Sequence, residues 1–536
     1  MVLRFAPRLA LVLAGLLASV AGAAPLDLAT ASIADVQAAF AAHSLTSEAL
    51  TKAYLQRSDA YDQQGPSINT VITRNPKAIE QARALDAERR AGKVRGPLHG
   101  IPILLKDNYD TFDLQTTGGS QLLLGSIPPD DAFVVKKLRA AGAVILAKVN
   151  LHEFAYGGGA PNGYSSLGGQ THNPHDPSRG PAGSSGGTGA GIAAAFAQFG
   201  LGSDTAGSIR NPSSANGITG IKPTRGLMSR DGIITLALSF DTGGPMARNI
   251  YDLAVSLGAM TGVDAADPAT AASAGHFETD YTKFLKKGAL QGARIGVMRD
   301  FFGQSPQTDF VMEQTILKLQ ALGATVIDPI KLPEFLLRGI GPMHTMMIDV
   351  EFKAQIAQYL STLRPGFPRT LEELVAKARD PKTAYTSPWK RDSMAGMDKA
   401  VGIDDPIYLA AKNQGLALTT AVVEGLFAKY KVDAMIYPSV PRPAGEIGEA
   451  RSPSAAAPGA PGAPANPAAL ANETGFPDVI VPAGMTPTGL PVTVSFFGPA
   501  WSEGKLLGYA YDLEQATHAI ALPKYTPRLA TDIVVH

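Results

Sequence analysis

The sequence predicts an α/β protein built around a mixed β-sheet. Apolar runs of strand length alternate with segments of helical periodicity, and the chain is long enough to bury a large core. The 536 residues are 45% hydrophobic, with 47 basic and 47 acidic side chains and a formal net charge of zero. This balance is typical of an ordinary soluble enzyme and gives no indication of nucleic-acid binding.

The elements follow one another along the chain. Thr46 or Ser47 is suited to cap a helix, residues 132–141 form another helix, and an apolar strand follows at 143–149. The same alternation continues in the second half of the chain. There we expect strands at 293–298, 324–327, 479–481 and 489–494, a helix face with Met312, Ile316 and Leu319, and a helix at 506–517.

Two segments depart from this alternation. Between about residues 343 and 426 the chain becomes helical and rich in methionine and aromatic residues, and we expect this region to determine specificity, although such side chains more often fill a core. Residues 441–467 are rich in proline, alanine and glycine, which predicts a flexible loop. With no internal repeat, residues 24–536 are expected to form one catalytic domain.

The N-terminus has the pattern of a signal peptide. Arg4 and Arg8 precede an apolar run at 9–20, and residues 21–23 (Ala-Gly-Ala) fit a cleavage site. The run is short for a membrane span, and the chain has no cysteine to carry a lipid anchor. We therefore expect a signal peptide at 1–23 and a periplasmic or secreted bacterial protein without stable membrane association. An uncleaved anchor is the alternative.

The segment from Gly180 to Pro212 carries the strongest chemical indication. A glycine-serine loop at 183–187 is followed by the run Asp204-Thr-Ala-Gly-Ser-Ile-Arg210, whose small residues let the backbone approach a reacting group. Consecutive amides in such a run can stabilise one developing oxyanion. A serine here is a candidate nucleophile, but it needs a base within hydrogen-bonding distance.

A candidate base ends the apolar run 101–106. The run predicts a buried strand that brings Lys106 inward, where burial disfavours the ammonium form and lowers the lysine pKa. Ser184 could pass a proton from Ser208 to Lys106, because a hydroxyl both donates and accepts. A single lysine at a strand end is usually solvated, and a Gly/Ser stretch is usually a loop. Neither motif alone would indicate a catalytic site, so the prediction rests on their occurring together.

With these motifs the sequence resembles the amidase signature family, serine hydrolases with a Ser–cis-Ser–Lys triad. The match includes Lys106, the loop 183–187 and residues 204–212, with Ser208 lying 24 positions after Ser184, and it continues through 220–224 and 244–248. The resemblance extends over about residues 30–520. It implies the amidase signature fold, in which a large mixed β-sheet is covered by helices on both sides.

The resemblance also implies a role for each matching residue. Ser208 is the nucleophile that forms an acyl-enzyme, Ser184 is the bridging serine on a cis peptide, and Lys106 is the base. Ala206 stands where the family usually has glycine, a departure that matters only if this residue needs positive φ. The oxyanion hole consists of the amides of Thr205, Ala206, Gly207 and Ser208, and the supporting residues are Asp204, Arg210 and Ser185. Asp204 and Arg210 flank the nucleophile and could pair to fix its loop; two separately solvated charges are the alternative.

Other chemistries find less support. Asp107 could orient Lys106, but a strand-end aspartate often caps the following turn, and we leave it outside the catalytic set. Because the chain has no cysteine, it has no thiol nucleophile or thiolate metal site. His172 and His175 flank Pro174, which breaks the helical register of two metal ligands. We expect neither a metal nor a cofactor.

Within the family, the sequence is most similar to secreted bacterial peptide amidases, through residues 96–100, 168–171, 229–232 and 500–503. This implies that a small-molecule or peptide amide is the substrate and that ammonia is released from C-terminal peptide amides. The related glutaminyl-tRNA amidotransferase component works in a cytosolic complex, which a signal peptide contradicts. The alternatives are an aryl acylamidase, a fatty-acid amide, carbamate or ester hydrolase, and a catalytically inactive secreted binding protein.

Overall fold

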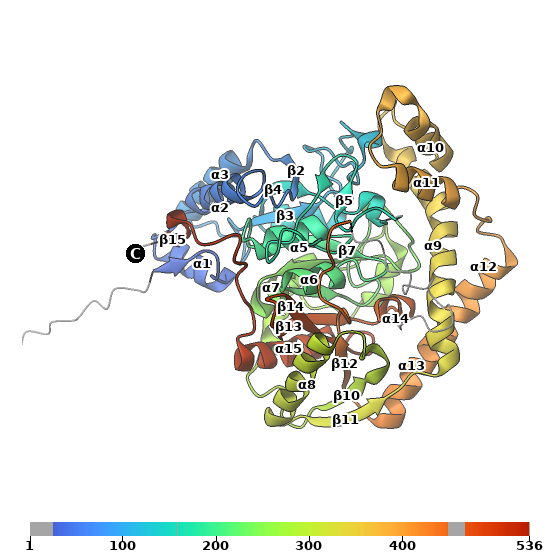
Figure 1. Cartoon of the computed structure of the whole chain (residues 1–536). Helices are drawn as coiled ribbons and strands as arrows, with labels where there is room; N and C mark the ends of the chain where they lie inside the picture. Colours follow the sequence, from blue (N-terminus) through green and yellow to red (C-terminus); the bar gives the residue numbers. More distant parts are fainter. Residues whose placement is uncertain (1–24, 158, 449–466, 535–536) are drawn as a thin grey trace, which may run out of the picture.

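The computed structural model describes residues 25–157, 159–448 and 467–534 (Figure 1). Within these ranges, eleven strands form one mixed sheet at the centre of the molecule. In order across the sheet they are β11 (Thr325–Ile330), β10 (Arg294–Met298), β12 (Ala434–Pro438), β14 (Pro491–Phe497), β13 (Asp478–Met485), β8 (Thr219–Lys222), β9 (Thr242–Ala247), β7 (Phe199–Asp204), β3 (Pro102–Lys106), β4 (Val144–Val149) and β2 (Val71–Arg74).

The sheet has a parallel group of three strands on each side of an antiparallel middle, and its last strand, β2, pairs antiparallel with β4. β10 runs parallel to β11 and β12, and β3 runs parallel to β4 and β7, whereas β14, β13, β8 and β9 pair in antiparallel fashion. Leu105 in β3 is opposite Leu201 in β7. Because parallel neighbours end at the same edge of a sheet, Lys106 lies beside the end of β7 at Ser203 and Asp204.

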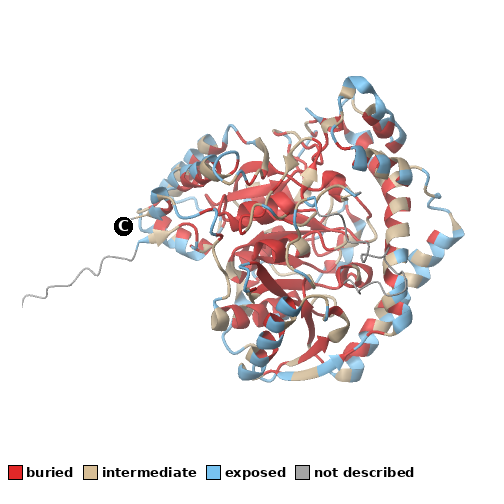
Figure 2. Ribbon diagram, in the orientation of Figure 1, coloured by how far each residue is buried: buried red, intermediate tan, exposed pale blue. Residues whose placement is uncertain are grey.

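Helices cover both faces of the sheet, as predicted. In β12, Ile436 belongs to the large core that also contains residues of α7 (Ile250–Met260), α8 (Pro306–Ala321) and α15 (Glu503–Thr517). The next residue, Tyr437, belongs to a second core with α13 (Leu416–Tyr430) and α14 (Ala468–Thr474). Successive strand residues point to opposite faces, so the sheet is buried on both sides, as Figure 2 shows.

The predicted elements are present with small shifts at their ends. Thr46 caps α2 (Ser47–Tyr61) by accepting a hydrogen bond from the Ala49 amide at 3.1 Å. The helix expected at 132–141 is α4 (Phe133–Ala140), and the strand at 324–327 extends to Ile330 as β11. The other helices are α1 (Ile33–Ala41), α3 (Ala78–Arg90), α5 (Gly186–Ala193), α6 (Arg210–Asn216), α9 (Glu334–Thr362), α10 (Leu371–Arg379), α11 (Pro388–Met397) and α12 (Pro406–Ala410).

The helical region is longer than the sequence predicts. It begins with α9 at Glu334 and ends with α13 at Tyr430, and α9 runs along one side of the body in Figure 1. The methionine content that marks this region starts only at Met343, after the first turns of α9. Met347 and Met394 are fully buried and pack in a third core, which joins α9 to α10 and α11.

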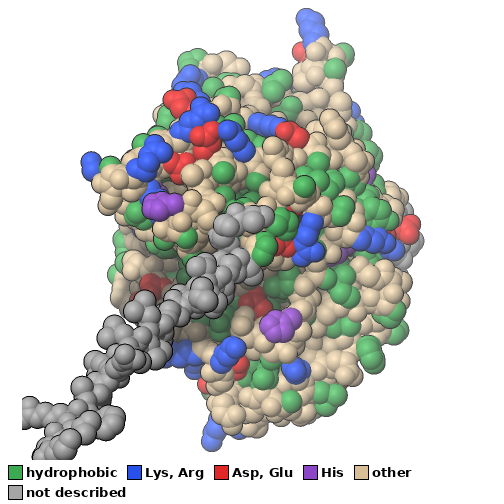
Figure 3. All heavy atoms as spheres, turned by 90° about the vertical axis from the view of Figure 1, so that its left-hand side faces the viewer, with side chains coloured by type: hydrophobic (Ala, Val, Ile, Leu, Met, Phe, Trp, Pro, Cys, Tyr) green, Lys and Arg blue, Asp and Glu red, His purple; other side chains and the backbone are tan. Residues whose placement is uncertain are grey.

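Two predicted segments lie outside the described residues: the signal peptide at 1–23 entirely, and the loop 441–467 except for residues 441–448 and 467. None of the described helices combines the length and the apolar character that crossing a membrane requires. The face shown in Figure 3 carries basic side chains interspersed with acidic ones. On α2, α3 and the residues just after α3, the pairs Arg83–Glu48 and Arg95–Glu88 join charges of opposite sign.

Candidate active site

Lys106, the last residue of β3, is completely buried. Its Nζ lies 2.7 Å from Ser184 Oγ and 2.9 Å from Ser203 Oγ. Asn108 Nδ2 donates to the same Ser203 hydroxyl at 3.0 Å and so fixes its position. Burial lowers the pKa of Lys106 to about 7, although the carboxylates of Asp204 and Asp241 oppose the shift. A substantial fraction of this lysine is therefore a neutral amine near neutral pH.

Ser184 lies in the glycine-serine loop, immediately before α5. The peptide bond between Gly183 and Ser184 is cis, as the family resemblance implies. The Ser184 carbonyl accepts a hydrogen bond from the His152 amide at 3.0 Å, and its side chain is 2% exposed. Ser185 connects this loop to the next one, because its amide donates to the Ser208 carbonyl at 3.1 Å. The two serine loops are therefore in direct contact.

The loop that carries Ser208 is folded around the carboxylate of Asp204. One carboxylate oxygen accepts from the Gly207 amide at 2.8 Å, and the other accepts from the Ile209 amide at 3.0 Å. Gly207 has φ +93°, a conformation that favours glycine over any residue with a Cβ. This turn presents Ser208, at 7% exposure, between the end of β7 and the start of α6.

Asp204 is paired with Arg210, as the sequence suggests. Arg210 donates to the two carboxylate oxygens from Nε at 3.1 Å and from Nη2 at 3.0 Å, and both side chains are buried. Burial by itself would raise the pKa of Asp204, but the charge and hydrogen bonds of Arg210 hold it well below its usual range. The pair is therefore ionised, which suits a carboxylate that has to accept several backbone donors.

The amides proposed for an oxyanion hole are not equivalent. The Gly207 amide already donates to Asp204, as described above. Within the described chain, the amides of Thr205, Ala206 and Ser208 donate to no protein acceptor. The positive φ of this loop is at Gly207, not at Ala206, so the alanine fits the backbone and retains its amide. The departure at Ala206 therefore introduces no backbone conflict.

Several residues of the site escape sequence reasoning because they act through contacts between distant segments. Asn472 on α14 donates to Asp204 Oδ1 at 3.0 Å and accepts from Arg210 Nη2 at 2.5 Å. Asp478 at the start of β13 lies 3.3 Å from Arg210 Nη1. Asn472 and Asp478 both lie within the range that the resemblance covers, but no local pattern marks either of them as a partner of Arg210.

Asp107 has the structural role that the sequence leaves open. Its carboxylate accepts from the Thr117 amide at 3.2 Å and the Gly119 amide at 3.3 Å, and it pairs with Lys148 at 3.3 Å. All of these groups lie on the turn after β3 or on β4. Asp107 therefore holds the turn that follows Lys106 and forms its ion pair with Lys148.

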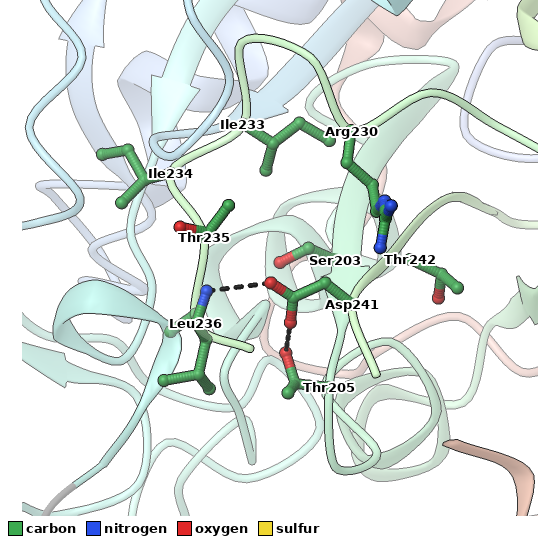
Figure 4. A pocket seen from close by; sticks show the side chains of 10 residues that line it. Ser203, Thr205, Arg230, Ile233, Ile234, Thr235, Leu236, Asp241 and Thr242 are labelled. Carbon is green, nitrogen blue, oxygen red and sulfur yellow. Dashed lines mark hydrogen bonds between the residues drawn. The ribbon is translucent and has the colours of Figure 1, made fainter. Parts of the chain in front are cut away.

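A small pocket lies beside the loop that carries Ser208 and is lined in part by Ser203 and Thr205 (Figure 4). Asp241 is at its centre, accepting from the Thr205 hydroxyl at 2.5 Å and from the Leu236 amide at 2.9 Å. Ser203, which contacts Lys106, also lines it, so the pocket adjoins the buried lysine. The rest of the lining combines the apolar Ala155, Ile233 and Ile234 with the polar Thr235, Thr242 and Arg230.

The histidines noted in the sequence bind backbone carbonyls. His172 Nδ1 lies 2.7 Å from the Pro177 carbonyl, and His175 Nε2 lies 3.1 Å from the Asn216 carbonyl. Among the residues that the structure describes, no three histidine, aspartate or glutamate side chains are grouped so that they could hold a metal ion.

Comparisons with known proteins agree with this geometry. The family described as Amidase matches residues 49–507. The chain is 36% identical over 495 residues to a component of the glutamyl-tRNA(Gln) amidotransferase of Pseudomonas aeruginosa, covering 91% of this chain and 97% of that protein. The structure of a peptide amidase from Stenotrophomonas maltophilia superposes with a TM-score of 0.85 at 38% identity, over 92% of this chain and 99% of that one.

A further solved structure, an amidase family protein from Bacillus anthracis, superposes with a TM-score of 0.81 at 29% identity and covers 93% of each chain. The family match extends over most of the sequence, and the shared fold has the large mixed sheet with helices on both faces. The family motifs predict a buried lysine in contact with one serine and close to a second serine loop. Lys106, Ser184 and the loop that carries Ser208 have this arrangement. The chain belongs to the amidase signature family and is a serine hydrolase that cleaves carbon–nitrogen amide bonds.

Proposed function

We propose that the protein hydrolyses C-terminal peptide amides through an acyl-enzyme on Ser208. The observation that carries the catalytic part is the 2.7 Å contact between the buried Lys106 Nζ and Ser184 Oγ, on a loop that touches the backbone of Ser208. A serine needs a positioned base to become nucleophilic, and this contact connects a base to the serine loops. The assignment of the three roles follows from the family motifs.

In the proposed reaction, Ser208 Oγ attacks the amide carbon while its proton passes to Ser184 Oγ and the Ser184 proton passes to Lys106 Nζ. The proton then returns along the same path to the leaving nitrogen, the C–N bond breaks, and ammonia departs. Water attacks the resulting ester by the same proton path, which releases the carboxylic acid and restores Ser208. Each step needs Lys106 to accept a proton and then give it back.

The oxyanion of the tetrahedral intermediate would be held by backbone amides of the Ser208 loop. The amides of Thr205, Ala206 and Ser208 are the candidates, because they have no protein acceptor within the described chain. The Gly207 amide instead stabilises the turn through Asp204.

Support for a peptide amide as substrate comes from similarity and from the pocket. The peptide amidase of Stenotrophomonas maltophilia shares 38% of its sequence with this chain over nearly the whole of both. The pocket near Thr205 is lined by Ile233, Ile234 and Leu236, so apolar side chains lie close to the loop that carries Ser208. We further propose that the protein is periplasmic or secreted, on the signal-peptide pattern of residues 1–23.

The three proposed roles predict a ranking of variants. Ser208→Ala should abolish hydrolysis, whereas Lys106→Ala and Ser184→Ala should each lower kcat by about 10²-fold or more, the range for lost acid–base assistance. Asp107→Asn is a useful comparison, because this residue holds the turn after β3 without contacting the serines. Steady-state kinetics on one dipeptide amide measure all four variants. A Ser208→Ala protein with near wild-type kcat would contradict the assignment.

The lowered pKa of Lys106 predicts the pH profile. The amine accepts a proton only when it is neutral, and its pKa is about 7, so kcat/KM should rise about tenfold per pH unit below 7 and level off above it. Lys222→Met is a matched control, because burial also lowers the pKa of this lysine to about 7. The rise of kcat/KM below pH 7 should persist in Lys222→Met and be lost in Lys106→Met. If the rise is lost in Lys222→Met and kept in Lys106→Met, the titrating group is Lys222, and Lys106 is not the base.

The substrate proposal predicts a preference among acyl compounds. At one pH, kcat/KM for a dipeptide amide should exceed that for a fatty primary amide, and an acylanilide should not surpass it by more than about tenfold. An anilide has the better leaving group, so that margin of some 1.4 kcal/mol allows for intrinsic reactivity. If the anilide or the fatty amide is preferred by more than this margin, the peptide-amide assignment fails and the amide-hydrolase class remains.

A further inference from the structure

A histidine of the helical region contacts the nucleophile loop directly. His344, on α9, places its Nε2 3.0 Å from the carbonyl oxygen of Thr205, three residues before Ser208. The ring is 4% exposed and stacks on Phe240, with ring centroids 4.0 Å apart and an interplanar angle of 29°. A carbonyl oxygen can only accept a hydrogen bond, so Nε2 must carry the proton. The contact therefore fixes both the ring orientation and its tautomer.

The surroundings of His344 keep the ring neutral. Burial lowers the pKa of His344 to about 4. On the other side of the ring, Nδ1 lies 3.8 Å from Oε1 of Glu473 on α14, and burial raises the pKa of that carboxyl group to about 8. The imidazole and the carboxyl group are therefore both uncharged at neutral pH. A neutral ring with its proton on Nε2 is the form that the Thr205 carbonyl requires.

The peptide plane between Thr205 and Ala206 transmits this contact. Within the described chain the cis bonds are those at Ser184 and Pro329, so this one is trans, with its C=O and N–H pointing in opposite directions. When His344 holds the Thr205 oxygen toward α9, the Ala206 N–H must point away from α9. That N–H is one of the amides without a protein acceptor in the described chain.

The other restraints on this loop act on different groups. Asp204 binds the amides of Gly207 and Ile209, and Asp241 binds the Thr205 hydroxyl. Among the hydrogen bonds of the described residues, the one from His344 is the one that the Thr205 carbonyl accepts. Loss of this bond would leave the Thr205–Ala206 plane free to rotate while the rest of the loop stays held.

We propose that His344 is a positioning residue that aims the Ala206 amide at the oxyanion of the transition state. This inference rests on the proposed function, because it presumes attack by Ser208 on an amide carbonyl. It gives the helical region a role in the rate of the chemical step. The oxyanion forms only after attack, so the effect of His344 falls on kcat and leaves substrate binding largely unchanged.

Two amide substitutions test the proposal at one position. The glutamine Nε2 is as many bonds from Cβ as the histidine Nε2, whereas the asparagine amide reaches only the position of Nδ1. His344→Gln should therefore keep kcat within about threefold of wild type, and His344→Asn should lower it by about 10- to 100-fold, less than outright loss of an oxyanion donor. KM should change by less than about threefold in both. The same two substitutions at His172, outside the site, are the matched control and should not differ.

A transition-state analogue gives a second readout that a purely structural role would not affect. A dipeptide aldehyde adds Ser208 Oγ to its carbonyl carbon, and the serine proton moves to Lys106 through Ser184, which leaves an oxyanion in the hole. Its inhibition constant should rise in His344→Asn by the same factor as kcat falls, while that of the dipeptide acid product should stay constant. His344→Phe, which keeps the stack on Phe240 without a donor, should behave like His344→Asn.

The outcomes separate this inference from the proposed function. Equal kcat and equal aldehyde inhibition in His344→Gln and His344→Asn would overturn the positioning role, as would a folded His344→Phe with wild-type kcat. If His344→Asn fails to fold, the comparison of His344→Gln with His344→Phe decides. A wild-type protein that hydrolyses no amide would instead overturn the proposed function itself, before any variant of His344 is compared.

Discussion

The buried ion pair between Asp204 and Arg210 is the constraint on which the candidate site depends. The carboxylate accepts from two amides on either side of Ser208, and the guanidinium neutralises its charge inside the protein. Removing one partner of a buried pair leaves an uncompensated charge, which typically costs about 3–5 kcal/mol. The pair therefore shapes the turn that presents Ser208, and it cannot be weakened without disturbing that turn.

This pair also connects the loop to parts of the fold that are distant in sequence. Arg210 reaches Asp478 at the start of β13 and the Ala468 carbonyl on α14, while Asn472 on the same helix contacts Asp204. Glu473, next to Asn472, faces His344 of α9. The sheet supplies Lys106 and Asp204 at one edge, because β3 and β7 are parallel neighbours. Helices on one face then hold the loop from outside.

Sequence reasoning reached the parts of this arrangement that are local or that form a spaced motif. The strand ending in Lys106, the pairing of Asp204 with Arg210 and the cap at Thr46 follow from neighbouring residues, and the structure has all three. Contacts such as His344 with Thr205 join residues 139 positions apart, and no local pattern marks them. The helical region begins at Glu334, ahead of the predicted start near residue 343, because the methionines that indicate this region occur only from Met343 onward.

We propose that Ser208, and no other serine, becomes nucleophilic in this site. Mass spectrometry of the protein after reaction with a fluorophosphonate tests this role, because the reagent bonds covalently to an activated serine. We expect a single adduct, on the peptide containing Ser208, with loss of amide hydrolysis in proportion to labelling. An adduct on Ser184, or full activity in a fully labelled protein with Ser208 unmodified, would show that Ser208 is not the nucleophile.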